Sequence, residues 1–228
     1  REPDAHQVLK SAVSGAQVWE ASVETFFNGH LNETWDAENK TLLTGDFNGD
    51  GVDDILWRRP SDGLVALWWM NAQYQPSGVR IGRRDTAWTL CANDDFNGDG
   101  IDDLFWLHDD AQYAGLWLMT ESGAPTGIRI PRAYVGNECL GAGDFDADGK
   151  ASLLWQSAQG LEIWTYQSGQ SMSVESLTAE PALVFENVLD FNGDRHADIV
   201  WRDRDTSHTV FWINDRDGGF ARHQRARR

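Results

Sequence analysis

The sequence predicts an all-β protein built from a repeated unit of four strands. Two observations support this class: a twelve-residue acidic motif recurs four times, and short apolar runs bounded by turn residues fill the space between its copies. The motif reads DFNGDGVDDILW from Asp46, DFNGDGIDDLFW from Asp95, DFDADGKASLLW from Asp144 and DFNGDRHADIVW from Asp190, so successive copies begin 49, 49 and 46 residues apart. A period of this length is typical of architectures in which each repeat is one supersecondary unit.

Each repeat holds four apolar segments, which we expect to be strands. The first precedes the motif, as in KTLLTGD and TLCANDD, and the second is the apolar end of the motif itself. The third carries a further Trp, as in LVALWWMN, YAGLWLMT, LEIWTYQS and TVFWINDR, and the fourth is short, as in SGVRIG and TGIRIP. Short runs rich in Val, Ile, Leu, Trp and Phe between Gly, Pro, Asn, Asp and Ser are typical of strands. No stretch keeps a helical apolar period long enough to predict a helix.

The N-terminal part fits the same unit with its front missing. Val8 stands in the place of the first Trp of the unit, Trp19 stands in that of the second, and TFFNGHL resembles the fourth strand. The repeat units are approximately residues 1–32, 33–82, 83–131, 132–181 and 182–228, within a single domain of residues 1–228. Four-stranded units of this size are the blades of β-propellers. We therefore expect a propeller with about five blades in this chain, the first incomplete; a parallel β-helix is disfavoured because its coils are usually much shorter.

The acidic motif predicts a calcium loop. Its pattern, D-x-[DN]-x-D-G-x-x-D, lets side chains at the first, third and fifth positions converge on one hard cation, with a backbone carbonyl at the seventh and a carboxylate at the ninth. The expected ligands are Asp46, Asn48, Asp50, Val52 and Asp54; Asp95, Asn97, Asp99, Ile101 and Asp103; Asp144, Asp146, Asp148 and Lys150; and Asp190, Asn192, Asp194, His196 and Asp198. We expect up to four calcium ions.

Two of the four loops depart from the pattern and should bind more weakly. Ser152 replaces the ninth-position Asp of the third loop, and Arg195 replaces the turn Gly of the fourth. An EF-hand would need Glu at the twelfth position and flanking helices, whereas this position is Trp in every copy. Asp, Asn and Gly also form ordinary hairpin turns, but four copies in register favour a metal site.

The run GDFNGDGVDDILWRRPSDGLVALWWMN resembles the FG-GAP or VCBS repeat of integrin-type β-propellers and bacterial secreted proteins. The resemblance extends clearly from Thr41 to Asn214. It implies calcium in the loop between the first and second strands of a blade, with a stabilising and not a catalytic role. Members of that family commonly have seven blades, so the resemblance leaves open a fragment, a five-bladed ring, or completion by another chain or domain.

Composition restricts the partners. A net charge of −17 and a pI near 4.5 argue against nucleic acid and anionic membrane surfaces, and no apolar run is long enough for a membrane span. With a 49-residue offset, Cys91 aligns with Leu140 and not with Cys139, so we expect the two cysteines on opposite faces of equivalent strands, as separate core thiols. A disulfide is the alternative.

Most of the repeated Trp residues are expected in the core between blades. Trp35, Trp69 and Trp88 lie outside the core phase and are the candidates for stacking on a glycan. No catalytic motif is present and the six His residues share no repeat phase. We expect a secreted or cell-surface module, not an enzyme, that recognises a glycan or an extracellular protein, as lectins and adhesion proteins do. A purely structural or oligomerisation module is the main alternative, and a hydrolase with an unrecognised site a third.

Overall fold

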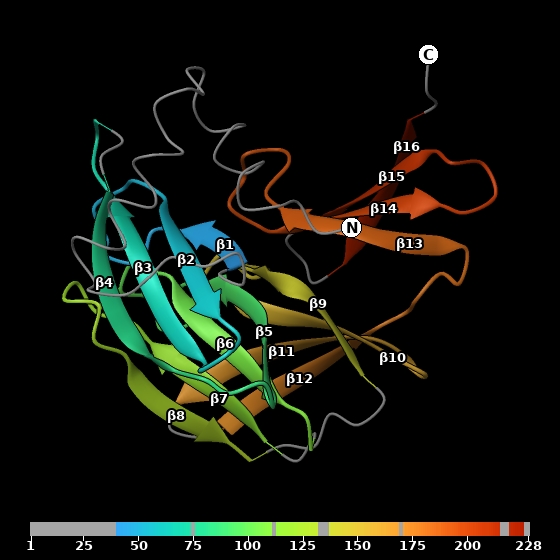
Figure 1. Ribbon diagram of the computed structural model, residues 1–228. Helices are drawn as coiled ribbons and strands as arrows, with labels where there is room; N and C mark the ends of the chain where they lie inside the picture. The colour runs from blue at the N-terminus through green and yellow to red at the C-terminus, as the bar shows by residue number, and fades with distance from the viewer. Residues whose placement is uncertain are drawn as a thin grey trace. The chain divides into compact units, whose positions relative to one another are not determined.

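The computed structural model describes residues 40–73, 76–110, 113–131, 137–168, 171–214 and 219–225. These residues form sixteen strands and no helix, arranged as four antiparallel sheets of four strands each (Figure 1). We call the sheets blades 1 to 4. The predicted incomplete first unit, residues 1–32, lies outside the described residues.

In every blade the strands that are consecutive in sequence are neighbours in the sheet. Blade 1 consists of β1 (Lys40–Gly45), β2 (Asp54–Arg59), β3 (Leu64–Met70) and β4 (Pro76–Arg83). Blade 2 consists of β5 (Trp88–Asp94), β6 (Asp103–His108), β7 (Ala114–Leu118) and β8 (Thr126–Ile130). Blade 3 consists of β9 (Glu138–Gly143), β10 (Ser152–Ser157), β11 (Gly160–Ser168) and β12 (Ser171–Leu177). Blade 4 consists of β13 (Leu183–Leu189), β14 (Asp198–Asp203), β15 (Thr209–Asn214) and β16 (Phe220–Arg225). The prediction of four strands per repeat is confirmed for these four units.

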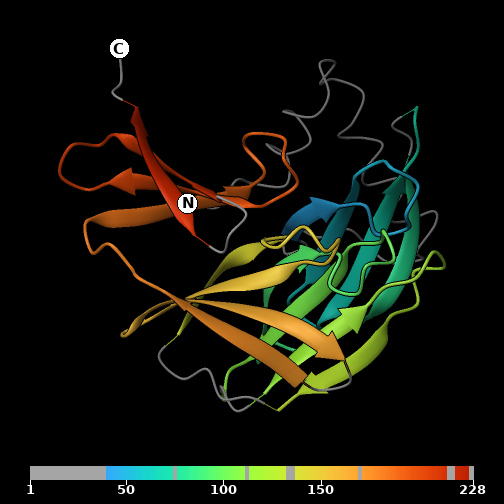
Figure 2. The same cartoon turned by 180° about the vertical axis from the view of Figure 1, so that it is seen from behind.

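The chain divides into two compact units, residues 1–89 with 119–126 and residues 90–118 with 127–228. Blade 1 belongs to the first unit, and blades 3 and 4 with most of blade 2 belong to the second. The strands are antiparallel and alternate their side chains between two faces. Both faces of the second strand in each blade are apolar, as expected for sheets stacked on each other; Figure 2 shows the same strands from behind.

In the second unit, neighbouring blades share their cores. Between blades 2 and 3, Phe96, Phe105 and Leu116 pack in one cluster with Leu153 and Trp155. The cluster between blades 3 and 4 is built from equivalent positions, with Phe145, Leu154 and Ile163 on one side and Ala197, Ile199 and Trp201 on the other. The eight Trp residues predicted for the core are all at most 6% exposed: Trp57, Trp68, Trp106, Trp117, Trp155, Trp164, Trp201 and Trp212.

A backbone hydrogen bond joins each of these blade pairs at the same repeat position. The Ala151 amide donates to the carbonyl of Asp95 at 2.7 Å, and the Ala197 amide donates to the carbonyl of Asp144 at 2.7 Å. In both cases the donor is the eighth residue of one acidic motif and the acceptor is the first residue of the preceding motif. The loops are therefore part of the joint between blades as well as candidate metal sites.

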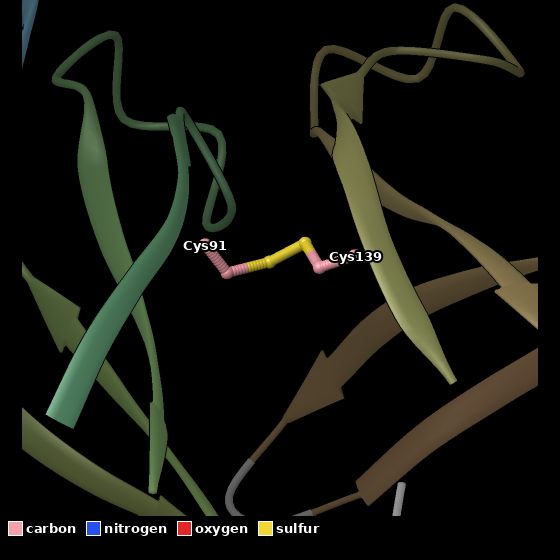
Figure 3. Close-up of a disulfide and its surroundings, with 2 residues drawn as sticks. All are labelled: Cys91 and Cys139. Atoms are coloured by element: carbon pink, nitrogen blue, oxygen red, sulfur yellow. A yellow bond between two sulfur atoms is a disulfide. The ribbon is translucent and has the colours of Figure 1, made fainter. Parts of the chain in front are cut away.

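The two cysteines form a disulfide between β5 and β9, with their Cα atoms 6.0 Å apart (Figure 3). The expectation of two separate thiols is wrong. Adjacent sheets pack with opposite faces against each other. On equivalent strands of two neighbouring blades, side chains that point in opposite directions therefore face each other between the sheets. A register shift adds to this, because Cys139 pairs with Trp155 and Gly141 with Leu154, which leaves Leu140, the equivalent of Cys91, at a bulge.

Candidate metal centres

Each acidic motif forms the loop between the first and second strands of its blade, running from the end of β1, β5, β9 or β13 to the start of β2, β6, β10 or β14. The glycine at the sixth position of each of the first three loops has a φ near +80°: 81° in Gly51, 82° in Gly100 and 82° in Gly149. Only glycine adopts this region without strain. The loops therefore fold as tight turns that draw the acidic side chains inward.

The first aspartate of the motif is the centre around which the loop winds. Asp46 Oδ1 accepts hydrogen bonds from the amides of Gly49 at 2.7 Å and Asp50 at 3.1 Å, and Oδ2 accepts one from Gly51 at 2.8 Å. Asp95 and Asp190 repeat this pattern with the amides of Gly98, Asp99 and Gly100 and of Gly193, Asp194 and Arg195. The backbone amides that donate to Asp190, above all the amide of Arg195, lower the pKa of this carboxylate.

The third and fifth positions lie side by side. Asn97 Nδ2 donates to Asp99 Oδ2 at 3.1 Å, and Asn192 Nδ2 donates to Asp194 Oδ2 at 3.2 Å. The amide also carries an oxygen, which is the atom a hard cation would take. The structure thus brings the side chains at positions three and five together in the second and fourth loops, and in the first loop the side chains of Asp46 and Asn48 meet at the Asp50 amide.

The third loop holds the most convergent group of carboxylates. Oxygen atoms of Asp144, Asp146 and Asp148 all lie within 4.8 Å of one another. Asp144 Oδ2 accepts the amide of Gly149 at 3.0 Å, whereas Oδ1 is buried and has no hydrogen-bond partner. Burial raises the pKa of Asp144, and the charges of Asp146 and Asp148 add to the effect. The Ala147 amide lies close enough to this carboxylate to lower its pKa but makes no hydrogen bond with Oδ1. A buried anionic oxygen without such a bond is the observation that fits a bound cation.

The ninth-position aspartates have a second role that sequence reasoning missed. Asp54 is fully buried, and its two oxygens accept the amides of Phe47 at 3.1 Å and Met70 at 2.8 Å. Asp198 does the same with Phe191 at 2.9 Å and Asn214 at 2.8 Å. Each carboxylate therefore ties the loop to the end of the third strand. Desolvation raises the pKa of Asp54 to about 7. A carboxylate oxygen has more than one lone pair, so a role as metal ligand stays a prediction.

In the two loops that depart from the pattern, the structure shows how the residues that replace the ninth Asp and the turn Gly are accommodated. Ser152, in place of the ninth Asp, exchanges a hydrogen bond of 2.7 Å with the hydroxyl of Thr165 inside the sheet. Arg195, in place of the turn Gly, has φ of 74° and so adopts the left-handed region predicted to strain it. The expected ligand at His196 is its backbone carbonyl. The Nδ1 atom of its ring lies 3.2 Å from the carbonyl oxygen of Phe145 in blade 3.

The candidate Trp platforms are partly covered. Trp69 is half-buried, and a Cβ placed on Gly123 would lie 3.0 Å from its ring. Trp88 is also half-buried, with the guanidinium carbon of Arg84 4.7 Å from its ring centroid. Trp35 lies outside the described residues. The Trp69 and Trp88 rings are thus more exposed than the core Trp residues but already make contacts within the protein.

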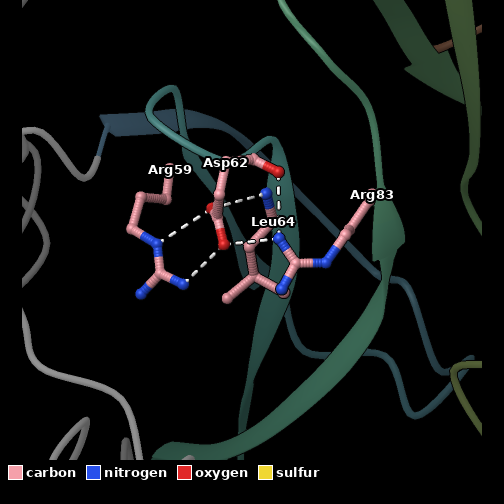
Figure 4. Close-up of polar contacts among 4 residues, drawn as sticks. All are labelled: Arg59, Asp62, Leu64 and Arg83. Carbon is pink, nitrogen blue, oxygen red and sulfur yellow. Dashed lines mark hydrogen bonds and ion pairs between the residues drawn. The ribbon is translucent and has the colours of Figure 1, made fainter.

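A separate polar cluster closes the hairpin between β2 and β3 (Figure 4). Asp62 accepts hydrogen bonds from Arg59 Nε at 3.0 Å, from Arg59 Nη2 at 2.8 Å and from the Leu64 amide at 3.1 Å, and it also pairs with Arg83. The two guanidinium groups, Arg59 foremost, lower the pKa of Asp62. These charges are engaged with one another and serve the hairpin.

Comparison with known families assigns the repeat. Residues 40–75 match the FG-GAP repeat and residues 95–155 match the FG-GAP-like repeat. These two stretches are therefore FG-GAP repeats. Among curated proteins, no sequence matches it.

Solved structures of similar fold are β-propeller-like. One is a lectin from Agrocybe aegerita that recognises non-reducing terminal N-acetylglucosamine, with a TM-score of 0.59, 13% identity, and coverage of 82% of this chain and 52% of the lectin. Another is the Photorhabdus luminescens Tc holotoxin pore, with a TM-score of 0.56, 16% identity, and coverage of 85% of this chain and 10% of the toxin. The chain thus spans about half of the lectin and a tenth of the toxin. Together with the four four-stranded blades, these neighbours confirm the predicted all-β propeller fold. The part of the chain that the structure describes has no helix that could cross a membrane.

Proposed function

We propose that this chain is a calcium-stabilised propeller module that works outside the cell as a binding protein. The observation that carries the calcium part is the third loop, where three carboxylates converge and the buried Asp144 Oδ1 has no donor. Calcium prefers several oxygen ligands in a flexible cage. The same loop architecture recurs in the other three blades.

The chain's own residues would hold the ion at equivalent positions. In the first loop these are the side chains of Asp46, Asn48 and Asp50, the carbonyl of Val52 and a free lone pair of Asp54. A bound ion would supply positive charge to a loop that joins two strands, and in the second, third and fourth loops that loop also takes part in a backbone hydrogen bond between blades. The metal therefore stabilises the fold, and no catalytic role is assigned to it.

An extracellular location is supported by the disulfide between Cys91 and Cys139. Disulfides persist in oxidising compartments and are rare in the cytosol. Calcium loops of this open, acidic kind are also suited to the high calcium concentrations outside cells.

For the ligand we propose a glycan or an extracellular protein. The similar fold of the N-acetylglucosamine lectin and the partial exposure of Trp69 and Trp88 support a glycan. The contacts that Gly123 and Arg84 make with these rings favour the alternative, a structural module without a ligand of its own. We propose no enzymatic activity.

The calcium proposal is tested by thermal unfolding, with excess calcium or with a chelator, of the intact chain and of Asp50→Ala. Ligand at a hundred times its dissociation constant stabilises the native state by about 2.7 kcal/mol per site, which for a chain of this size raises the melting temperature by roughly 5–10 °C. Asp50→Ala should lower the melting temperature mainly with calcium. Asp53→Ala, which removes the same charge from an exposed neighbour in the same loop, is the control. Equal losses for Asp50→Ala with calcium and with chelator would contradict the assignment.

The glycan proposal is tested on an array that includes N-acetylglucosamine-terminated glycans, with calcium present. We expect binding that Trp88→Ala weakens by roughly five- to thirtyfold, because loss of one stacked aromatic ring costs roughly 1–2 kcal/mol. Trp68→Phe, a change in the buried neighbouring core, controls for altered stability. Silence of the whole array with folded, calcium-loaded protein would favour the structural module.

A further inference from the structure

The pair Asn-Gly stands at the third and fourth positions of three of the acidic loops. The three pairs are Asn48-Gly49, Asn97-Gly98 and Asn192-Gly193, and the third loop has Asp146-Ala147 instead. A glycine has no Cβ beside its nitrogen, so the backbone nitrogen that follows such an asparagine can reach the carbon of the side-chain amide. The pair is therefore the point in each loop at which the side chain can react with the main chain.

The fourth loop aligns the two reacting groups. Asn192 Oδ1 accepts a hydrogen bond from the Asp194 amide at 2.9 Å. This bond closes a small ring that contains both Asn192 Cγ and the Gly193 nitrogen, so the side-chain amide is folded back over the backbone of Gly193. The same donor stabilises the negative charge that forms on Oδ1 when a nucleophile adds to Cγ, as preorganised donors do in enzyme sites.

Solvent reaches both residues of this pair. Asn192 and Gly193 are exposed, and Gly193 has a φ of 79°. No heavy atom beyond the chain neighbours of Gly193 lies within 4 Å of the position that a Cβ would take there. The Gly193 amide donates to Asp190 Oδ1 at 2.7 Å, which holds its peptide unit in one orientation. Among the described residues, none therefore packs over Gly193 on the side where a Cβ would stand.

The second loop holds the same pair in different surroundings. Asn97 is half-buried, and the Lys150 side chain of the third loop lies over Gly98, with its Cε 3.2 Å from the position of a Cβ there. The Asp99 amide donates to Asp95 and not to Asn97 Oδ1. The sequence DFNGD is common to both loops. Asn97 is thus a matched comparison within the same chain, covered and without the aligned donor.

We propose that Asn192 is a site of spontaneous deamidation, at which this side chain is converted to aspartate and isoaspartate in the folded protein. Solvent takes the proton of the Gly193 amide, and the nitrogen attacks Asn192 Cγ. As this N–C bond forms, the bond from Cγ to Nδ2 breaks, and Nδ2 takes a proton from water and leaves as ammonia. The product is a cyclic imide that joins the side chain to the backbone.

Water then opens the imide at either of its two carbonyl carbons. Cleavage of the bond from the Gly193 nitrogen to Cγ gives aspartate. Cleavage of the bond from that nitrogen to the backbone carbonyl carbon of Asn192 gives isoaspartate, whose main chain runs through the former side chain. The net change consumes one water and releases one ammonia, so no oxidant, reductant or cofactor is needed.

Both products add a negative charge at a predicted ligand position. Aspartate reproduces the side chain that the third loop already has in Asp146. Isoaspartate lengthens the main chain between Asp190 and Asp194, which should break the hydrogen bonds that gather the loop around the Asp190 carboxylate. Any effect on calcium rests on the proposed function, whereas the deamidation itself does not.

The test follows Asn192 and Asn97 in one sample of the unchanged chain, by peptide mapping with mass spectrometry during incubation at mildly alkaline pH with a chelator. The chelator makes the outcome independent of calcium. We expect Asn192 to be converted at least roughly fivefold faster than Asn97, because a covered pair reacts only when the loop opens locally. Both aspartate and isoaspartate should appear at Asn192. In concentrated denaturant the two rates should converge, since the surrounding sequences match.

Gly193→Ala tests the role of the attacking nitrogen. Ala147 occupies the equivalent position of the third loop with a φ of 57°, so the turn accepts this side chain. The added Cβ should slow the conversion of Asn192 by roughly tenfold or more, because it stands beside the nitrogen. The rate at Asn97 should not change.

Four outcomes overturn the proposal. Three concern the unchanged chain: conversion of Asn192 no faster than that of Asn97, a difference between the two that persists in denaturant, and aspartate without isoaspartate, which assigns the loss of the amide to direct hydrolysis. The fourth is an unchanged rate at Asn192 in Gly193→Ala. If this variant does not fold, the three comparisons in the unchanged chain still decide the question.

Discussion

Aspartate has several distinct functions in this protein, and its surroundings decide which. The first Asp of the first, second and fourth loops receives three backbone amides, which lower the pKa of Asp190. The ninth Asp is buried between strands, and desolvation raises the pKa of Asp54 to about 7 despite two backbone hydrogen bonds. Asp62 lies between two guanidinium groups that lower its pKa. Identical side chains thus respond in opposite directions, because solvent loss penalises the charge and nearby donors favour it.

The Asp62 cluster predicts a measurable acid sensitivity. The folded pKa of Asp62 lies below its unfolded value of about 3.9, so its contribution to stability is present above that value and is lost as pH falls through the folded pKa. Asp62→Asn should lower the free energy of unfolding at pH 7 by at most about 1 kcal/mol, since the carboxylate is partly solvated. The difference from the unchanged chain should shrink as the pH falls from 5 toward 2.

Urea unfolding across this pH range measures the effect, with Asp109→Asn as the control because it is an exposed residue in the equivalent turn of blade 2. Unfolding free energies of Asp62→Asn and the unchanged chain that differ by a constant amount from pH 7 to pH 2 would show that the Arg pairs do not stabilise the fold.

The positions of the loop side chains could be predicted from sequence, but the hydrogen bonds of the ninth Asp could not. Asp46, Asn48 and Asp50 come together because the loop is short and its glycines allow the turn, which are local properties. The hydrogen bond that the Met70 amide donates to Asp54 depends on how β2 pairs with β3, since Ile55 faces Trp68 in that register. Such a contact between residues sixteen apart requires the sheet.

At the scale of the strands, the joint between blades 3 and 4 depends on a close approach. Gly143 is the last residue of β9, and a Cβ placed there would lie 2.7 Å from both Ala197 Cβ and Val188 Cγ1. Real Cβ contacts are not this short, so β9 and the start of blade 4 fit together only without a side chain at this position. The Ala197 amide also donates across the same joint.

Gly143→Ala should therefore destabilise the protein by about 1–3 kcal/mol, the usual cost of adding a methyl group to a packed interior. Gly141→Ala on the same strand is the matched control, because its Cβ would meet Val188 Cγ2 at an ordinary 3.6 Å. Chemical denaturation of both variants measures the difference. Equal free energies of unfolding for the two variants would mean that the strands separate easily and that the joint does not limit stability.

Strand number and order followed from the sequence, whereas the disulfide did not. The repeat period, the turn residues and the apolar runs all lie within one blade, so local patterns predict four strands in sequence order. The bond between Cys91 and Cys139 depends on two further facts, the face through which neighbouring sheets meet and the bulge at Leu140. An alignment of the repeats that assumes strict alternation of side chains along each strand predicts neither the contacting face nor the bulge.

For the molecule as a whole, the acidic charge destabilises the compact state and also gives a reason for metal binding in the loops. The net charge of −17 favours solubility but also repels itself in the compact state. The repulsion is concentrated in the loops, as in the third loop, where three carboxylates approach within 4.8 Å. Bound calcium would reduce it at its source, while dissolved salt can only screen it.

This difference predicts how salt affects stability in the two metal states. With chelator, the melting temperature should rise as NaCl increases from 0.05 to 0.5 M, because the Debye length falls from roughly 14 to 4 Å and screens the repulsion between loop carboxylates. With saturating calcium the rise should be clearly smaller, since the ion already neutralises those groups. Scanning calorimetry in NaCl and in KCl measures the two slopes, and agreement between the two salts excludes a specific effect of sodium. Equal slopes with calcium and with chelator would place the salt-sensitive repulsion elsewhere on the surface and remove the electrostatic reason for metal in the loops.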